Sequence, residues 1–272
     1  MTSAIERIVV SLDAVSETGA AIEAAARLAA RWNATLHGVF VEDEDLLRLA
    51  ALPFASQVSL GAGVEPLTAA QAARQLRAFA EAAQRELAAA ADRLDLRWSF
   101  EVVRGADAAN TVASAPGDFI VACAVSRPIG AHFRIDARWQ TAAPGPSSLL
   151  LMHPARAGGA VAVVLHDREA AAARVLEAAA QFAEAASASL VVICAPELAH
   201  DKVFQAWVDG RLAGYLVRAR IEPAPRDPAA LQRHILGLDC GLLALAADAE
   251  PGAPELRREI AIRAGCDILV IR

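Results

Sequence analysis

Two aspartates directly follow apolar runs of the kind that form buried strands. Asp13 ends the run over residues 8–12, and Asp167 follows the run over residues 160–165, with His166 beside it. A carboxylate there can contact a ligand, because open α/β sheets hold their ligands at the carboxyl ends of the strands. The same aspartate can instead cap the turn after the strand. Both interpretations stay open, and His166 is interpreted as an incidental strand-end histidine.

Other catalytic chemistry finds no support in the residue pattern. Lys202 is the only lysine, and its surroundings differ from a glycine-rich phosphate loop. The segment from Gly61 to Gly63 lacks the third glycine of a dinucleotide fingerprint, and no Gly-x-Ser-x-Gly elbow is present. The six histidines show no metal-ligand spacing. We therefore expect a protein that is not an enzyme and has no metal site.

Composition narrows the class of protein further. A chain of 272 residues with 56% apolar residues has material for two ordinary domains. The net charge of −6 is spread without a basic stripe, which argues against nucleic-acid binding. No apolar run reaches the ~20 residues of a membrane helix, and the N-terminus does not resemble a signal peptide. We expect a soluble cytoplasmic protein. Its four cysteines are predicted to be buried, inert thiols: Cys123, Cys194, Cys240 and Cys266.

The two halves of the chain match one another without a gap. Glu23-Ala-Ala-Ala-Arg-Leu-Ala-Ala lies over Glu177-Ala-Ala-Ala-Gln-Phe-Ala-Glu, 154 residues later, and the same separation places Asp13 on Asp167. Such a repeat predicts two copies of one structural unit. We expect the first domain over residues 1–154 and the second over residues 159–272, joined by a short Gly-rich linker.

Each half alternates strands with helices. The strand runs are apolar on both faces, which is typical of a parallel sheet covered by helices on both sides. The predicted fold is α/β, with two tandem doubly wound five-stranded parallel-sheet domains. The expected strands are residues 8–12, 36–41, 98–103, 119–123, 148–152, 160–165, 190–194, 215–221, 242–245 and 268–271. The expected helices are one beginning near a cap at Ser16, then residues 76–94, 106–113, 169–186, 199–212, 229–236 and 254–264.

Four segments in this order resemble the universal stress protein family, in its tandem two-domain form. They are Arg7-Ile-Val-Val-Ser-Leu-Asp13, Val102-Val-Arg-Gly-Ala-Asp-Ala-Ala, Asp118-Phe-Ile-Val-Ala and Cys266-Asp-Ile-Leu-Val-Ile-Arg272. The resemblance implies the adenine nucleotide alpha hydrolase-like fold and a site for ATP or AMP beside the first-strand aspartate. It also implies that the last strands pair across a dyad, which we assign to residues 149–152 and 268–271. A tandem chain can satisfy that pairing internally.

The loop after the fourth strand departs from the family pattern. In nucleotide-binding members glycines wrap the phosphates there, because only glycine lets backbone N–H groups approach so closely. The corresponding positions in this chain are Cys123, Ser126, Asp136 and Ala137, and none matches. A shifted alignment that uses Gly130 stays open. Residues 246–249 of the second half match no better, and Asp248 adds a negative charge. We therefore expect that ordinary ATP binding is lost.

An insertion over residues 42–66 has no counterpart in the second half. It begins with the acidic run Glu42-Asp-Glu-Asp45 and continues with an apolar segment. It is either a solvated turn with a short helix over the sheet edge, or a lid or partner surface. In either case the acidic run is expected to repel an anionic ligand.

Two functions follow from the resemblance. The first is a non-enzymatic stress-response module that acts through a protein partner or self-association, with no cofactor. The second is an ATP- or AMP-binding protein with an atypical phosphate loop. The candidate binding residues for the second function are Asp13, Asp167, Val41, Cys123 and Ser126. Pairing of the two domains within the chain is expected, and a homodimer stays open.

Overall fold

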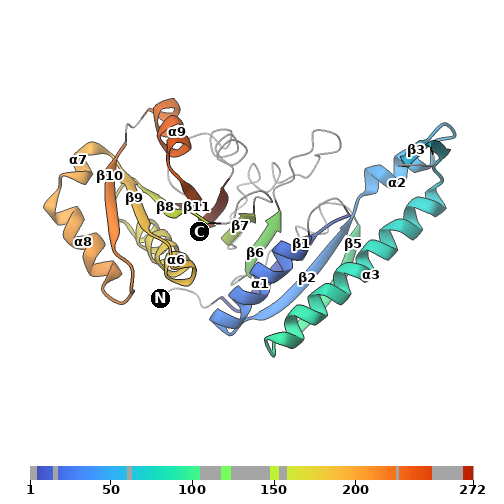
Figure 1. The fold of residues 1–272 in the computed structure, drawn as a ribbon, viewed down its shortest axis with the longest axis horizontal. Coiled ribbons are helices and arrows are strands. Elements are labelled where there is room, and N and C mark those ends of the chain that lie inside the picture. The colour runs from blue at the N-terminus through green and yellow to red at the C-terminus, as the bar shows by residue number, and fades with distance from the viewer. Residues whose placement is uncertain are drawn as a thin grey trace. The chain divides into compact units, whose positions relative to one another are not determined.

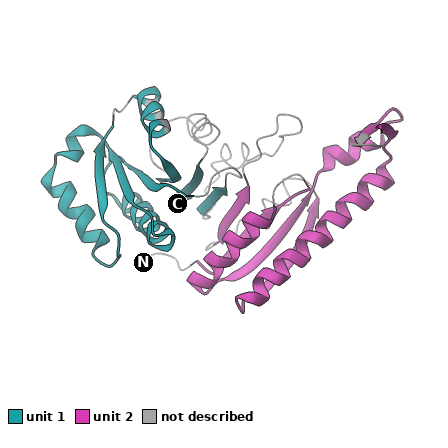
Figure 2. Cartoon of the chain, in the orientation of Figure 1, with its two compact units in different colours: residues 1–4, 126–272 teal, residues 5–125 magenta. Residues whose placement is uncertain are grey.

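A computed structural model describes residues 5–14, 18–59, 63–104, 118–123, 148–152, 158–224, 227–246 and 266–271. The chain divides into an N-terminal unit, residues 5–125, and a C-terminal unit, residues 126–272 with residues 1–4 (Figure 2). Each unit is an α/β unit built on parallel strands (Figure 1). The predicted domain limits at residues 154 and 159 stay a prediction.

The described sheet of the N-terminal unit has the strand order β6-β1-β2-β5, and all its strand pairs are parallel. The four strands form where continuous apolar runs predict them, since strands buried on both faces need apolar residues at every position. They are β1 (Arg7–Leu12), β2 (Thr35–Glu42), β5 (Trp98–Arg104) and β6 (Asp118–Cys123). The prediction of these strands is confirmed.

Two helices cover one face of this sheet. In α1 (Thr18–Trp32), the ring of Trp32 lies edge-on to Phe119 of β6, with centroids 5.1 Å apart. Helix α3 (Ala69–Arg93) begins earlier than predicted because Thr68 and Gln71 form a capping box. Arg93 of α3 also forms an ion pair with Glu23 of α1. The two helices are therefore tied to the sheet by apolar contacts and to each other by charge.

The parallel strands of the C-terminal unit follow the order β10-β9-β8-β11-β12. The chain moves outward from β8 to β10 and then returns to β11 on the other side of β8. Since crossovers between parallel strands are right-handed, the helices of these two arms lie on opposite faces. The strands are β8 (Ala160–Leu165), β9 (Leu190–Cys194), β10 (Ala219–Pro223), β11 (Cys240–Ala246) and β12 (Asp267–Ile271). The helices are α6 (Ala170–Ala186), α7 (Pro196–Ala199), α8 (Lys202–Leu212) and α9 (Pro228–Gly237).

Two predictions for this unit are wrong in detail. The helix expected over residues 199–212 is split, because Asp201 accepts a hydrogen bond from Val203 N at 2.8 Å and so starts α8 as a separate helix. The strand expected over residues 215–221 begins only at Ala219, and Leu216 is 96% exposed. The predicted helices at 106–113 and 254–264, and the predicted cap Ser16, lie outside the described residues.

Strand β7 (Ser148–Met152) belongs to the C-terminal unit and pairs antiparallel with β12. Leu151 lies opposite Ile268, Leu150 opposite Leu269 and Leu149 opposite Val270. The predicted pairing of residues 149–152 with 268–271 is confirmed. The strand that ends the first sequence repeat thus joins the edge of the sheet formed by the second.

The four cysteines are free and buried, as predicted. Within the described residues, no helix is long and apolar enough to cross a membrane. The described part of the chain likewise contains no cluster of three side chains suited to a metal ion.

Gly38 of β2 permits α3 to pack closely on the sheet. A Cβ at this position would lie 2.8 Å from Leu87 Cδ2 and 2.8 Å from Phe100 Cδ2. We predict that Gly38→Ala lowers the free energy of unfolding by about 1–3 kcal/mol, measured by urea denaturation, because the core there has no room for a methyl group.

Gly210 of α8 provides the matched control for this glycine. Nothing lies within 4 Å of a Cβ placed there. Gly210→Ala is expected to raise the free energy of unfolding by about 0.5–1 kcal/mol through helix propensity. The same sign of change in both variants would contradict the packing role of Gly38.

Candidate functional site

Three of the candidate residues meet at the carboxyl edge of the N-terminal sheet. Strand β1 lies between β2 and β6, with Leu12 paired to Phe40 and Ser11 paired to Ala122. The next positions on these three strands are Asp13, Val41 and Cys123, which therefore lie side by side. The fifth candidate, Ser126, lies outside the described residues, as do Gly130, Asp136 and Ala137.

Both polar candidates at this edge are buried. The exposed fraction is 9% for Asp13 and 7% for Cys123. Cys123 stands at the position at which the family resemblance calls for a glycine. A buried carboxylate and a buried thiol thus lie at the ends of two neighbouring strands.

Asp167 does not occupy the position that the repeat predicts. The register pairs Leu165 of β8 with Cys194 of β9, as it pairs Leu12 of β1 with Phe40 of β2. Leu12 and Leu165 are 153 residues apart, whereas Phe40 and Cys194 are 154 apart. The second repeat therefore has one additional residue between its first strand and its first helix, and the gapless match is wrong at this point.

His166, and not Asp167, follows β8 in the way that Asp13 follows β1. Asp167 is one residue further on and exposed, and its carboxylate accepts a hydrogen bond from Glu169 N at 2.8 Å. This is the turn-capping role that the sequence left open. The helices do match at 154 residues, since every buried position of α1 has a buried counterpart in α6: Ala21, Ile22, Ala25, Ala26 and Ala29 with Val175, Leu176, Ala179, Ala180 and Ala183.

Three strands of the C-terminal sheet end in buried, apolar side chains at its carboxyl edge. Leu165 ends β8, Cys194 ends β9 and Ala246 ends β11, and all three are buried. Burial raises the pKa of Cys194 to about 11, so this thiol stays protonated at neutral pH. Residues 247–249, the predicted counterpart of the phosphate loop, lie outside the described residues.

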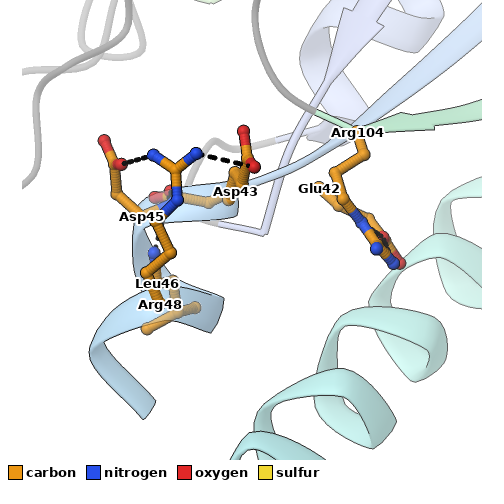
Figure 3. A network of polar contacts seen from close by, with 7 residues as sticks. Glu42, Asp43, Asp45, Leu46, Arg48 and Arg104 are labelled. Atoms are coloured by element: carbon orange, nitrogen blue, oxygen red, sulfur yellow. Dashed lines mark hydrogen bonds and ion pairs between the residues drawn. The ribbon is translucent and has the colours of Figure 1, made fainter. Parts of the chain in front are cut away.

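The acidic run of the insertion has local structural roles (Figure 3). Asp43 caps α2 (Glu44–Ala50) by accepting hydrogen bonds from Asp45 N at 2.9 Å and Leu46 N at 3.1 Å. Arg48 pairs with Glu44 at 2.8 Å and with Asp45 at 3.3 Å. Two carboxylates of the run are therefore partly neutralised by one arginine of the same helix.

The first residue of the run, Glu42, is tied to the sheet. It ends β2, is 8% exposed, and its carboxylate accepts hydrogen bonds from Arg104 Nε at 3.2 Å and Nη2 at 3.0 Å (Figure 3). Arg104 is its register partner on β5. This pair places a second buried carboxylate, after Asp13, at the carboxyl edge of the sheet.

The rest of the insertion forms a hairpin that the sequence does not predict. Strands β3 (Ser56–Ser59) and β4 (Gly63–Pro66) pair antiparallel, with Val58 opposite Val64. The hairpin follows α2, which packs on α3. Several of the insertion's apolar side chains are exposed, among them Leu49, Phe54 and Val64.

Three solved structures share this architecture over 98% of the chain. One, named as a universal stress protein from Pseudomonas aeruginosa UCBPP-PA14, has a TM-score of 0.60 at 15% identity, with 93% of its own chain covered. A universal stress protein from Archaeoglobus fulgidus DSM 4304 has a TM-score of 0.55 at 12% identity, with 96% covered. The chain has the universal stress protein fold.

A third structure, of a functionally unknown protein from Pseudomonas aeruginosa PAO1, shares the universal stress protein fold with this chain. Its TM-score is 0.58 at 16% identity, with 92% of that chain covered. No family model and no curated protein matches the sequence. The recognised likeness is thus one of three-dimensional architecture, and the family resemblance noted in the sequence is supported at that level.

At the opposite, amino edge of the N-terminal sheet, this example of the universal stress protein fold has a polar cluster that sequence reasoning missed. Arg7 begins β1, Asp118 begins β6, and the two are register partners. Arg7 donates from Nε to Asp118 Oδ1 at 2.8 Å and from Nη2 to Oδ2 at 2.6 Å. The signal was present in the sequence as opposite charges at the first positions of two neighbouring strands. Loss of Arg7 would leave a buried carboxylate without this arginine, a change that costs about 3–5 kcal/mol in buried pairs.

His37 of β2 lies on the same face of the sheet as Arg7. A hydrogen bond of 2.7 Å joins its Nδ1 to Ser99 Oγ, while its Nε2 lies 3.9 Å from Glu101 Oε2. Within the described structure, this buried Nε2 has no hydrogen-bond partner. Burial lowers the pKa of His37, the charge of Arg7 lowers it further, and Glu101 and Asp118 oppose the shift.

The lowered pKa of His37 predicts acid sensitivity. The neutral ring contributes stability that is fully present above the unfolded-state value of 6.5 and is lost as the pH falls through the lower folded-state pKa. We expect the free energy of unfolding of the H37Q variant to fall less between about pH 7 and pH 5 than that of the unmodified protein, measured by urea denaturation. The H200Q variant, which changes an exposed histidine, should keep the original pH dependence. An unchanged slope in H37Q would contradict this assignment.

Proposed function

We propose that this protein is a non-enzymatic stress-response module that acts in the cytoplasm through protein contacts and does not bind ATP in the ordinary manner. The universal stress protein fold supports the class. Four free, buried cysteines are compatible with a reducing compartment. The proposal concerns a protein partner or self-association, with no nucleic acid or membrane involved.

The observation that carries this proposal is the filled carboxyl edge of the N-terminal sheet. Cys123 places a buried side chain at the end of β6, where the resemblance calls for a glycine that lets backbone N–H groups approach phosphate. Asp13 and Glu42 add two buried carboxylates at the same edge. A polyphosphate there would be repelled by the Asp13 carboxylate and would meet the Cys123 side chain, while the Glu42 carboxylate is paired with Arg104.

The exposed apolar side chains of the insertion support action through protein contacts. Leu49 is 53% exposed, Val64 71% and Phe54 76%. Exposed apolar patches mark many protein interaction sites, and these three side chains come from one insertion. The insertion thereby favours the partner-surface interpretation over that of a simple solvated turn.

The proposal is tested by titration with ATP and AMP, each with and without magnesium, followed by thermal denaturation. A nucleotide at a hundred times its Kd would stabilise the protein by about 2.7 kcal/mol. We expect no change in Tm with any of the four ligands, because Cys123 stands where the resemblance calls for the first glycine of the phosphate loop. A universal stress protein that binds ATP is the positive control. Saturable stabilisation by ATP would reject the proposal.

A second function, ATP or AMP binding with an atypical loop, is favoured by one specific observation. Asp13 is buried at the carboxyl end of the central strand, beside Val41, where the resemblance places the adenine. Under this alternative, Asp13→Ala abolishes nucleotide-dependent stabilisation in the same assay. Asp167→Ala leaves it unchanged, because Asp167 is exposed and caps a turn. Loss of stabilisation in both variants would contradict a site at Asp13.

A further inference from the structure

The C-terminal unit has a cavity at the amino edge of its sheet, at the opposite end of the strands from Leu165, Cys194 and Ala246. Its volume is about 380 Å³, within the usual size range of small-molecule sites. Residues from β8, β9, β10 and β11 line it, among them Ala160, Ala162, Val191, Arg220 and Cys240.

The strand register shows why the cavity exists in this unit. Val161 pairs with Leu190 as Ile8 pairs with Leu36, so Ala160 stands where the N-terminal unit has Arg7. Ala160 pairs with Cys240, and Arg7 pairs with Asp118, although a β-bulge adds Gly241 to β11 directly after this pair. The bidentate Arg7–Asp118 ion pair is thus replaced by a methyl group and a thiol.

The next row of residues across the sheet also differs between the two units. Val9, His37 and Ser99 are register partners in the N-terminal unit, and Ala162, Val191 and Arg220 are register partners at the corresponding positions. Two of these three side chains are shorter in the C-terminal unit, and valine replaces the polar His37, while the third, Arg220, is longer than Ser99. The polar cluster that fills the first unit is therefore absent from the second, and its space becomes a cavity with a buried apolar floor.

Arg220 supplies the charged group of this cavity. Its Nη2 pairs with Glu222 Oε1 at 2.7 Å, and its side chain is 68% exposed. Among the described residues, Glu222 is its single ion-pair partner, and a guanidinium has five N–H donors in a planar fork. Nη2 carries two N–H groups, so the guanidinium edge that Glu222 leaves, either Nε with Nη2 or Nη1 with Nη2, suits a carboxylate from a ligand.

Two acidic groups limit the charge of such a ligand. Asp239 also lines the cavity. Glu222, which pairs with Arg220 and lies 3.4 Å from His234 Nε2, adds negative charge near the guanidinium. A dianion such as a phosphate monoester is disfavoured by both carboxylates, while a neutral alcohol offers Arg220 one uncharged acceptor in place of a charged, two-oxygen one.

We propose that this cavity binds a small organic monocarboxylate, with its carboxylate on Arg220 and its apolar body over Ala162 and Val191. The floor suits this body because Ala162 and Val191 are 0% and 2% exposed. The inference does not depend on whether a nucleotide binds at the carboxyl edge of the N-terminal sheet.

The experiment is a titration of the full-length, isotope-labelled protein with hexanoate, followed by amide chemical shifts. We expect saturable changes in chemical shift that are largest for the amides of Gly159, Ala162 and Val191, which line the cavity. Hexanol and hexyl phosphate should bind more weakly than hexanoate. Shifts that centre on Asp13 and Val41, or tighter binding of hexyl phosphate, would overturn the proposal.

Arg220→Gln tests the charged anchor. We expect about tenfold weaker hexanoate binding, and equal affinity for hexanoate and hexanol, because the ligand loses its charge-assisted hydrogen bonds. Arg218→Gln is the matched control, since Arg218 is an exposed arginine two residues earlier that does not line the cavity. Equal loss of binding in both variants, or none in R220Q, would refute the role of Arg220.

The N-terminal unit supplies the design for blocking the cavity. The double variant A160R/C240D introduces the Arg–Asp pair of the first unit and is expected to abolish hexanoate binding. Circular dichroism and urea denaturation establish that each variant is folded. Ala162→Leu is a second block that introduces no charge, and full hexanoate binding by either folded variant would reject the cavity as the site.

Discussion

The structure depends on the hydrogen-bond register of its central parallel strands. Strands β1 and β8 each form backbone hydrogen bonds with a neighbour on both sides, which fixes their position along the sheet. A shift of one residue would turn every apolar side chain to the opposite face. The register thereby determines which residue reaches each edge of the sheet, and it decides that Asp13 is buried there while Asp167 is not.

The two units share an arrangement of four parallel strands but differ in the side chains at both edges of that sheet. At the carboxyl edge, the N-terminal unit has buried carboxylates and the C-terminal unit has apolar ends. At the amino edge, Arg7, Asp118 and His37 fill the first unit, and smaller side chains leave a cavity in the second. The four-strand arrangement is shared, so these contrasts come mainly from the side chains, together with a β-bulge between Cys240 and Leu242 that the β1–β6 pairing lacks. The repeat has kept its architecture while its surfaces have become chemically distinct.

Much of this architecture could be predicted from the sequence. Strands buried on both faces are continuous apolar runs, and amphipathic helices such as α1 repeat their apolar residues at helical spacing, so both are visible without a structure. The antiparallel pairing of β7 with β12 came from the family resemblance and is confirmed. The β3–β4 hairpin could not be seen, because each strand has only four residues and a single valine.

The candidate site was harder to predict than the fold. Counting from the matched helices places Asp13 on Asp167, whereas counting from strand pairing places it on His166. A one-residue insertion in a loop leaves no mark in composition or periodicity. The Arg7–Asp118 pair was also missed, since the two residues are far apart in the chain and only the pairing of β1 with β6 brings their opposite charges together.

The position of β7 has a further consequence for association between chains. A strand at the margin of a sheet exposes backbone N–H and C=O groups, which accept a strand from any other molecule that presents one. β12 has β11 on one side and β7 on the other, so its outer backbone groups are already engaged by the chain itself. Proteolysis that released residues 148–152 would expose the unpaired backbone edge of β12, to which another strand could bind. This short strand therefore covers a sheet edge that would otherwise be open to another strand.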